Sequence, residues 1–203
     1  MSLIEWARKV QAIAQNGLAF TKDRYDRERY EQLQELVASL LSAELEIPAA
    51  DAKAIWQHEK GYATPKIDVR GAVFVNGKIL LVRERSDGYW TLPGGWADIN
   101  DAPSEAVVRE IYEESGYHVT ASKLAALYDR NRHAHPPMLY HVYKVFFICD
   151  VAGGSPTKGL ETDSVGFFSL DKLPELSVAR VTRQQIERLF EHNQKREMPT
   201  DFD

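Results

Sequence analysis

Three glutamates with helical spacing are the residues of this sequence most suited to chemistry. Glu110, Glu113 and Glu114 stand at positions i, i+3 and i+4, so they share one face of a helix. Carboxylates on one face repel each other, and oxygen ligands without His or Cys among them favour Mg²⁺ or Mn²⁺ over zinc. Such metals bind phosphates and lower the pKa of an attacking water. The pattern predicts diphosphate hydrolysis, with a solvated acidic helix face as the alternative interpretation.

The segment around these glutamates has helix start and stop signals. Pro103 suits the first turn, and Gly116 suits the position just beyond the last turn. We therefore expect a helix over about 103–115. Arg109 lies four residues before Glu113 and can pair with it.

The preceding pair Gly94-Gly95 lets the chain turn tightly before this helix. A tight turn there could also bring a backbone carbonyl oxygen to a metal bound by the glutamates, and we take Gly95 as the candidate.

The whole stretch resembles the Nudix box of the Nudix hydrolase superfamily, G-x5-E-x7-R-E-U-x-E-E-x-G-U, where U is apolar. The matching positions are Gly95, Arg109, Glu110, Ile111, Glu113, Glu114, Gly116 and Tyr117. The resemblance implies a mixed sheet sandwiched between helices. It implies hydrolysis of a nucleoside diphosphate linked to a group X, giving a nucleoside monophosphate and phosphoryl-X. It also implies that the three glutamates bind the metal and that Arg109 orients a box carboxylate.

One position departs from the box. The glutamate expected six residues after Gly95 is Asp101, which keeps the charge but is one methylene shorter. Asn100 replaces a glycine that is common there. In the family this position supports the loop more than the chemistry, so we expect activity to survive.

Two further stretches resemble a bacterial Nudix subgroup that has an N-terminal helical domain and is described as acting on CDP-choline and ADP-ribose. They are residues 61–70 and 90–98. A non-catalytic module that senses ADP-ribose or another nucleotide is an alternative, as is a Nudix enzyme acting on capped RNA or nucleoside triphosphates. The net charge of −5 and the lack of a basic groove weigh against RNA.

Four further residues are candidates for the site. Glu161 lies in a polar loop from which some Nudix enzymes take a catalytic glutamate; otherwise a box glutamate could accept the proton. Arg70 and Arg83 suit a phosphate, with surface ion pairing as the alternative. Trp96 could stack on a base or ribose, although core packing is the more common use of such aromatics.

The N-terminal part of the chain has helical apolar spacing and no chemical motif. Apolar residues recur from Trp6 to Ala14 and from Tyr30 to Leu45, and a third, shorter helix is expected over 52–56. Each helix has a single apolar stripe, so it must pack on its neighbours or on a partner. We predict an accessory or dimerisation domain over 1–62, a catalytic domain over 63–203, and a homodimer.

The rest of the chain predicts an α+β fold, an α/β/α sandwich with a mixed sheet. Asn76-Gly77 between two apolar runs predicts a type I′ hairpin. A second helix is expected over about 182–193, and the tail 197–203 is expected to fray. The expected strands are 67–75, 78–84, 124–128, 139–151 and 165–170.

Composition sets limits on location and cofactors. Cys149 is the only cysteine and lies in an apolar run, so we expect a buried thiol with neither a disulfide nor a cysteine zinc site. No apolar stretch suits a signal peptide or a membrane helix. We therefore expect a cytoplasmic enzyme with Mg²⁺ or Mn²⁺ as its cofactor.

Overall fold

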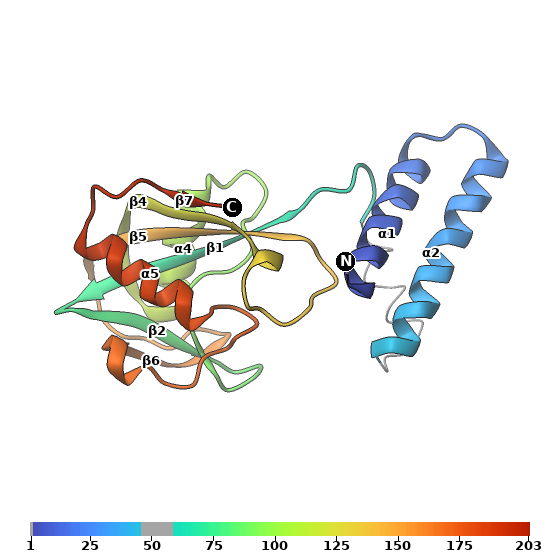
Figure 1. Ribbon diagram of the computed structural model, residues 1–203. Coiled ribbons are helices and arrows are strands. Elements are labelled where there is room, and N and C mark those ends of the chain that lie inside the picture. Colours follow the sequence, from blue (N-terminus) through green and yellow to red (C-terminus); the bar gives the residue numbers. More distant parts are fainter. Residues whose placement is uncertain (1, 46–58) are drawn as a thin grey trace. The chain divides into compact units, whose positions relative to one another are not determined.

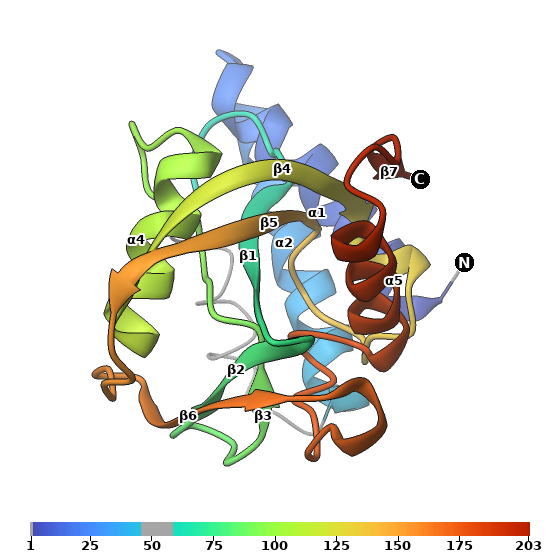
Figure 2. The same ribbon diagram turned by 90° about the vertical axis from the view of Figure 1, so that its left-hand side faces the viewer.

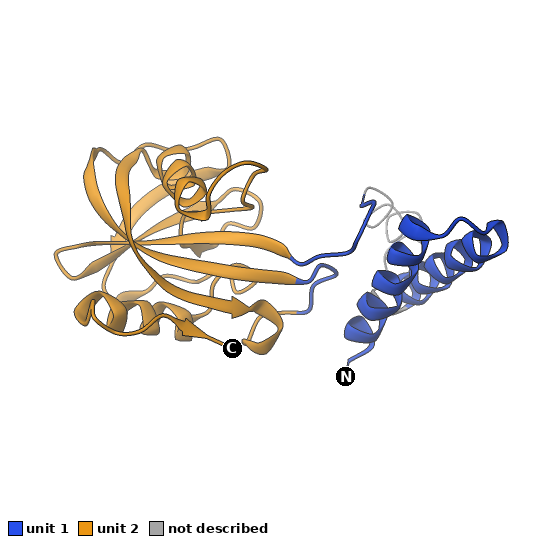
Figure 3. Ribbon diagram, turned by 90° about the horizontal axis from the view of Figure 1, so that it is seen from above, with its two compact units in different colours: residues 1–65, 137–141 blue, residues 66–136, 142–203 orange. Residues whose placement is uncertain are grey.

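The computed structural model describes residues 2–45 and 59–203 (Figure 1). It divides into two compact units (Figure 3): unit 1 comprises residues 1–65 and 137–141, and unit 2 comprises 66–136 and 142–203. The boundary therefore falls after Pro65 instead of after Tyr62. The loop 137–141 also belongs to the N-terminal unit. A division of the sequence into two consecutive segments could not predict this. The third helix expected over 52–56 lies outside the described residues.

Unit 1 contains two long helices joined by a short turn, α1 (Leu3–Phe20) and α2 (Arg24–Leu45). A capping box between Ser2 and Glu5 starts α1. The described core of the unit contains Ala7, Val37 and Leu41. The apolar stripes therefore bury part of their length against each other, as expected from their spacing.

Unit 2 is built on one mixed sheet. The strands are β1 (Lys66–Val75), β2 (Lys78–Glu84), β3 (Trp90–Thr91), β4 (Tyr117–Asp129), β5 (Val142–Gly154), β6 (Thr162–Phe168) and β7 (Asp201–Phe202). Their order is β3-β2-β1-β5-β4-β7, and β6 pairs with β2. Strands β1 and β5 are parallel, whereas β1 and β2 form an antiparallel hairpin. Its turn has positive φ at Asn76 (50°) and Gly77 (73°), as a type I′ turn requires.

Two helices lie on opposite sides of this sheet, α4 (Pro103–Ser115) and α5 (Arg183–Gln194) (Figure 2). The core under α4 includes Val69, Val73 and Ile111. The core under α5 includes Ala72 and Ile186. Successive β1 residues thus face opposite helices, as the pleat of a strand dictates. The predicted α+β sandwich is confirmed. Two short 3-10 helices, η1 (Arg130–Arg132) and η2 (Leu170–Lys172), lie in connections.

The C-terminal tail is an ordered part of the sheet, so the prediction that it frays is wrong. Strand β7 pairs in parallel with β4. The Asp201 carboxylate accepts hydrogen bonds from Arg188 at 2.5 and 2.8 Å and from the Tyr128 hydroxyl at 3.1 Å. These partners come from a helix and a strand distant in sequence, so the local composition of the tail did not predict them.

Other expectations have simpler outcomes. The strand expected from residue 139 starts at Val142, because its pairing with β1 begins there, opposite Lys66. The strand expected over 124–128 is the end of the longer β4. Cys149 is free and buried, as predicted. None of the described helices combines the length and apolarity needed to cross a bilayer.

Candidate active site

Helix α4 is fixed closely against the sheet, which determines where its carboxylates point. It ends at Gly116, whose φ of 76° is the left-handed conformation expected at this position. The buried residues Val107 and Ile111 pack on β1, where a side chain on Gly71 would overlap Ile111. The predicted helix bounds are confirmed.

The segment before α4 occupies the place beside the first half of β1. The backbone N–H of Gly71 donates to the Pro93 carbonyl at 2.9 Å, and that of Val69 donates to the Gly95 carbonyl at 2.8 Å. Gly94 has a φ of 136°, and a Cβ there would overlap the Val69 carbonyl oxygen. Glycine at position 94 is therefore required both by conformation and by space.

Glu114 connects α4 to this segment. Its side chain is buried, and its carboxylate accepts a hydrogen bond of 2.9 Å from the Gly94 N–H. Burial raises the pKa of Glu114 to about 8; Arg70 and the Gly94 hydrogen bond lower it, while Glu84 and Glu110 raise it. Desolvation is the largest of these effects, so the fold encloses the carboxylate of Glu114 more than its partners offset.

Glu110 lies against the next residue of the segment. A Cβ on Gly95 would stand 3.0 Å from the Glu110 Oε2 atom, so glycine leaves space for the carboxylate. Burial raises the pKa of Glu110 although Arg109 lowers it. Glu110 and Glu114 therefore flank Gly94-Gly95.

Arg109 gathers carboxylates from the loop and the helix. Its Nη1 atom donates to Glu110 at 2.8 Å and to Glu113 at 3.2 Å, the i,i+4 pairing predicted from the spacing. Its Nε atom donates to Asp101 at 3.2 Å, and its Nη2 atom lies 3.1 Å from an Asp98 oxygen. The shorter side chain of Asp101 thus still reaches the arginine.

Glu113 is the most exposed of the three glutamates, with 54% of its side chain accessible. Within the described ranges, no three His, Cys, Asp or Glu side chains converge tightly enough to form a preassembled metal cage. Glu110 and Glu113 are hydrogen-bonded to Arg109, and Glu114 is hydrogen-bonded to the Gly94 N–H. The Gly95 carbonyl accepts a hydrogen bond from the Val69 N–H. A carbonyl oxygen has a second lone pair, so that bond leaves Gly95 able to bind a cation.

A fourth carboxylate, Glu84, was not predicted from the sequence. It ends β2, is buried, and its Oε1 atom lies 3.2 Å from Arg180. Burial raises the pKa of Glu84; Arg180 and Arg70 lower it, while the charges of Asp87 and Glu161 raise it. The sequence did contain a signal for Glu84. Alternate residues of a strand face the same side, so Glu84 follows the buried Leu80 and Val82 on the α4 side of the sheet.

The loop that carries Glu161 is anchored to the end of α4. The Thr162 hydroxyl donates to the Glu114 carbonyl at 2.7 Å, and the Glu161 carbonyl accepts the Arg85 N–H at 2.9 Å. The Glu161 side chain is exposed. The fold therefore brings this loop beside the buried carboxylates.

The candidate substrate residues have different outcomes. Trp96 is 46% exposed next to Gly95, so its ring is available to a ligand. Arg83 pairs with Asp163 through bonds of 2.6 and 3.1 Å, which is the surface ion pairing considered as an alternative. Arg70 is buried and bonded to Asp68 and to the Leu92 carbonyl, and this placement does not favour the expected contact with a substrate phosphate.

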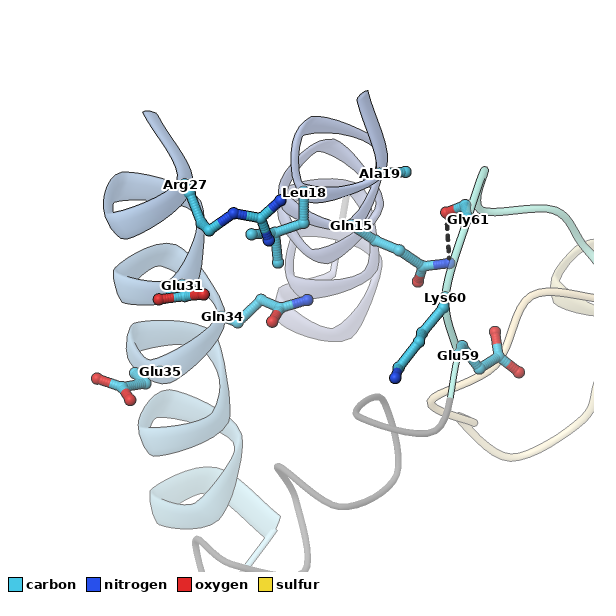
Figure 4. A pocket seen from close by; sticks show the side chains of 10 residues that line it. All are labelled: Gln15, Leu18, Ala19, Arg27, Glu31, Gln34, Glu35, Glu59, Lys60 and Gly61. Atoms are coloured by element: carbon cyan, nitrogen blue, oxygen red, sulfur yellow. Dashed lines mark hydrogen bonds between the residues drawn. The ribbon is translucent and has the colours of Figure 1, made fainter. Parts of the chain in front are cut away.

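A separate pocket of about 610 Å³ lies within unit 1 (Figure 4). Residues of α1, α2 and the segment 59–61 line it, including Gln15, Arg27, Glu31 and Lys60. Figure 4 shows the Gln15 amide bonded to the Gly61 carbonyl, at 3.1 Å. None of the box residues contributes to this pocket, so it is not the site described above.

Known families and proteins match nearly the whole length of the chain. The sequence model of a UDP-X-like, N-terminal oligomerisation domain matches residues 1–56, and that of the NUDIX domain matches residues 65–189. The Bacillus subtilis (strain 168) protein named "Putative ADP-ribose pyrophosphatase YjhB" is 48% identical over 200 residues, covering 98% of this chain and 96% of that protein.

Two solved structures are similar as well. An ADP-ribose pyrophosphatase from Streptococcus suis 89-1591 is 41% identical with a TM-score of 0.64, covering 69% of this chain and 100% of that one. A UDP-X diphosphatase is 32% identical with a TM-score of 0.65, covering 99% of this chain and 98% of that one. With its box helix packed against Gly94-Gly95 and these matches over both of its parts, the chain belongs to the Nudix family and is a Nudix hydrolase.

Proposed function

We propose that this Nudix hydrolase is a metal-dependent pyrophosphatase that cleaves a nucleoside diphosphate linked to X, with ADP-ribose as its first candidate substrate. The products would be a nucleoside monophosphate and phosphoryl-X. The observation that carries the proposal is the placement of Glu110 and Glu114 against Gly94-Gly95, with Arg109 holding the adjacent carboxylates.

The donor set of this site fits a hard divalent cation. Glu110, Glu113, Glu114 and the Gly95 carbonyl offer only oxygen, which suits Mg²⁺ or Mn²⁺. Burial and the charges of neighbouring glutamates raise the pKa of Glu110 and Glu114. A nearby cation would lower both pKa values again, because it stabilises the ionised carboxylates. When bound, such an ion supplies charge stabilisation at the diphosphate and lowers the pKa of a bound water.

The protein's own residues have distinct tasks in this proposal. Arg109 orients Glu110 and Glu113, because its guanidinium bonds both. Glu161 is the first candidate to accept the proton of the attacking water, since its exposed carboxylate lies on the loop anchored to α4. Glu110 and Glu114 are the alternatives. Trp96 would stack on the base or ribose, because nearly half of its surface is open.

The substrate is argued from the relatives. Two similar proteins carry ADP-ribose in their names, and one similar structure is a UDP-X diphosphatase. CDP-choline rests on the sequence resemblance alone. ADP-ribose therefore comes first, UDP-linked compounds second and CDP-choline third.

A substrate panel tests this proposal. Purified protein with Mg²⁺ or Mn²⁺ is given ADP-ribose, a UDP-sugar, CDP-choline, NADH, a diadenosine polyphosphate, nucleoside triphosphates and capped RNA. Release of AMP from ADP-ribose is expected, and both EDTA and Glu113→Gln should remove it. Binding of ADP-ribose without any turnover would favour the alternative that the protein is a non-catalytic module that senses a nucleotide. Turnover of capped RNA or triphosphates alone would favour the other Nudix alternative.

We also propose that the protein is a homodimer joined through unit 1. The match to an oligomerisation domain supports this. So do three exposed apolar residues seven positions apart on α1, Trp6, Ile13 and Phe20, which a helix places along one face. The cytoplasmic location stays a prediction from the sequence.

A further inference from the structure

A buried cluster of three charged residues lies in the sheet beside the candidate active site, and no step described above uses it. Asp68 on β1 and Lys144 on β5 stand opposite each other in the parallel register. The Lys144 Nζ atom donates to the Asp68 Oδ2 atom. Arg70, two residues along β1, contacts the Asp68 Oδ1 atom from Nε at 3.0 Å and from Nη2 at 2.9 Å. We call Asp68, Arg70 and Lys144 the charge cluster.

Such a cluster is costly to bury, which makes its position informative. Exposure is 5% for Asp68, 6% for Arg70 and 1% for Lys144. Removing three charged groups from water costs free energy. A protein with apolar residues of similar size at these positions would often be no less stable. Arg70 and Lys144 outweigh burial and hold the pKa of Asp68 below its usual range. The cluster therefore keeps an ionised carboxylate buried within the sheet.

Arg70 links the charge cluster to the segment beside α4. Its Nη1 atom donates to the Leu92 carbonyl at 3.1 Å. The next two residues of that segment are fixed from β1, because Gly71 N–H bonds Pro93 and the Gly94 backbone lies directly against Arg70. The Gly94 N–H then reaches Glu114 at 2.9 Å. One continuous set of contacts thus joins Lys144 to Glu114.

We propose that Arg70 is a positioning residue: held by Asp68 and Lys144, it fixes the segment from Leu92 to Gly95 so that the Gly94 N–H holds Glu114. This inference rests on the proposed function only for its kinetic consequence. Arg70 would then act on catalysis through the position of Glu114 and not by binding a substrate phosphate. Its guanidinium is already bonded to Asp68 and to the Leu92 carbonyl.

The test compares this cluster with a matched pair elsewhere in unit 2. Asp68→Asn keeps the shape of the side chain but removes its negative charge, which weakens its bonds to Arg70 and Lys144. Arg70→Lys keeps the charge but cannot bond Asp68 and Leu92 as a fork. Asp201→Asn and Arg188→Lys are the controls. Asp201 is also bonded by an arginine, through two atoms at 2.5 and 2.8 Å, but on α5 and β7.

The first readout needs neither metal nor substrate. Amide hydrogen exchange is followed for Val69, Gly71 and Gly94, whose N–H groups bond to this segment or from it, together with the global free energy of unfolding. Both cluster variants should speed exchange of these amides by roughly tenfold beyond any global change. The control variants should leave these amides unchanged after the same correction. Equal exchange in cluster and control variants would overturn the inference.

The second readout separates positioning from substrate contact. A misplaced Glu114 should lower kcat by up to about 10²-fold with little change in KM. A rise in KM with kcat retained would instead assign Arg70 to phosphate binding and overturn the inference. If the wild-type protein hydrolyses nothing, the proposed function fails, and the exchange measurement still decides the positioning role. If one cluster variant does not fold, the other supplies both readouts.

Discussion

The carboxylate of Glu114 accepts the backbone N–H of Gly94 at 2.9 Å, across 20 residues of sequence. This bond joins the box helix to the segment that lies on β1. It also places a buried carboxylate between Arg70, which lowers its pKa, and two other glutamates, which raise it. The catalytic proposal depends on this arrangement, so Glu114 is the first residue to test.

Glu114→Gln should lower kcat by about 10²-fold or more while the protein stays folded. The amide oxygen can still accept the Gly94 N–H, but the charge that would bind a cation is lost. Steady-state hydrolysis of ADP-ribose and a thermal melt measure the two effects. Glu105→Gln, in the first turn of the same helix, is the control and should stay within about twofold of wild type. Near-normal turnover in Glu114→Gln would remove Glu114 from the site.

Gly94→Ala should destabilise unit 2 by about 2–5 kcal/mol, from a strained φ plus a steric overlap. A Cβ there would overlap the Val69 carbonyl oxygen. Gly77→Ala is the control, because Gly77 also has a positive φ but has nothing within 4 Å of the added Cβ. It should cost only about 1–2 kcal/mol. Chemical denaturation measures both, and equal losses would show that the packing on β1 does not matter.

Asp101→Ala should lower kcat by no more than roughly tenfold, and Asp101→Glu should be close to wild type. Asp101 reaches Arg109 at 3.2 Å, but Asp98, Glu110 and Glu113 also contact this guanidinium. Arg109→Lys should cost more than Asp101→Ala, since an ammonium cannot hold these partners together. The reverse order in kcat would make Asp101 the more important residue of the pair.

Metal binding should stabilise the protein more at alkaline than at acidic pH. The pKa of Glu114 is raised from 4.5 to about 8, so the folded state binds more protons than the unfolded state in that window. The free energy of unfolding without metal therefore falls as pH rises from about 4.5 to about 8, by an amount on the order of a few kcal/mol for this group.

A divalent cation favours the ionised carboxylate and must compete with the proton. The increase in melting temperature on adding Mn²⁺ should thus be larger at about pH 8.5 than at about pH 6. Glu114→Gln should flatten this difference, whereas Glu105→Gln should keep it. A pH-independent shift in the wild-type protein would contradict the assigned role of the Glu114 carboxylate.

Ile13→Glu should convert the protein from a dimer to a monomer. Ile13 is 61% exposed in the middle of the α1 face that also carries Trp6 and Phe20, so a charge there would be buried in the proposed interface. Ala19→Glu adds the same charge at an exposed position of the same helix, about a third of a turn away from that face, and is the control. Light scattering after gel filtration gives the molar mass, and a dimeric Ile13→Glu variant would place the interface elsewhere.

Local signals in the sequence determined the box helix and the first hairpin. Pro103 and Gly116 bound α4 because their backbone preferences act within a turn, and Asn76-Gly77 provides the positive φ of a type I′ turn. The period of the helix placed Glu110, Glu113 and Glu114 near one another. The same spacing correctly predicted the ion pair between Arg109 and Glu113. These features need only nearby residues, so no knowledge of the fold was necessary.

Only the tertiary structure decided which carboxylates are buried and what faces them. Glu114 is enclosed because the segment of Gly94 lies on β1, whereas Glu113 stays exposed on the same helix. Asp68 meets Lys144, 76 residues away, through the register of two parallel strands. Glu84 joins the site from β2, and the tail becomes β7 through partners on β4 and α5. Strand register and long-range packing bring these groups together, and a linear pattern of residue types does not encode those distances.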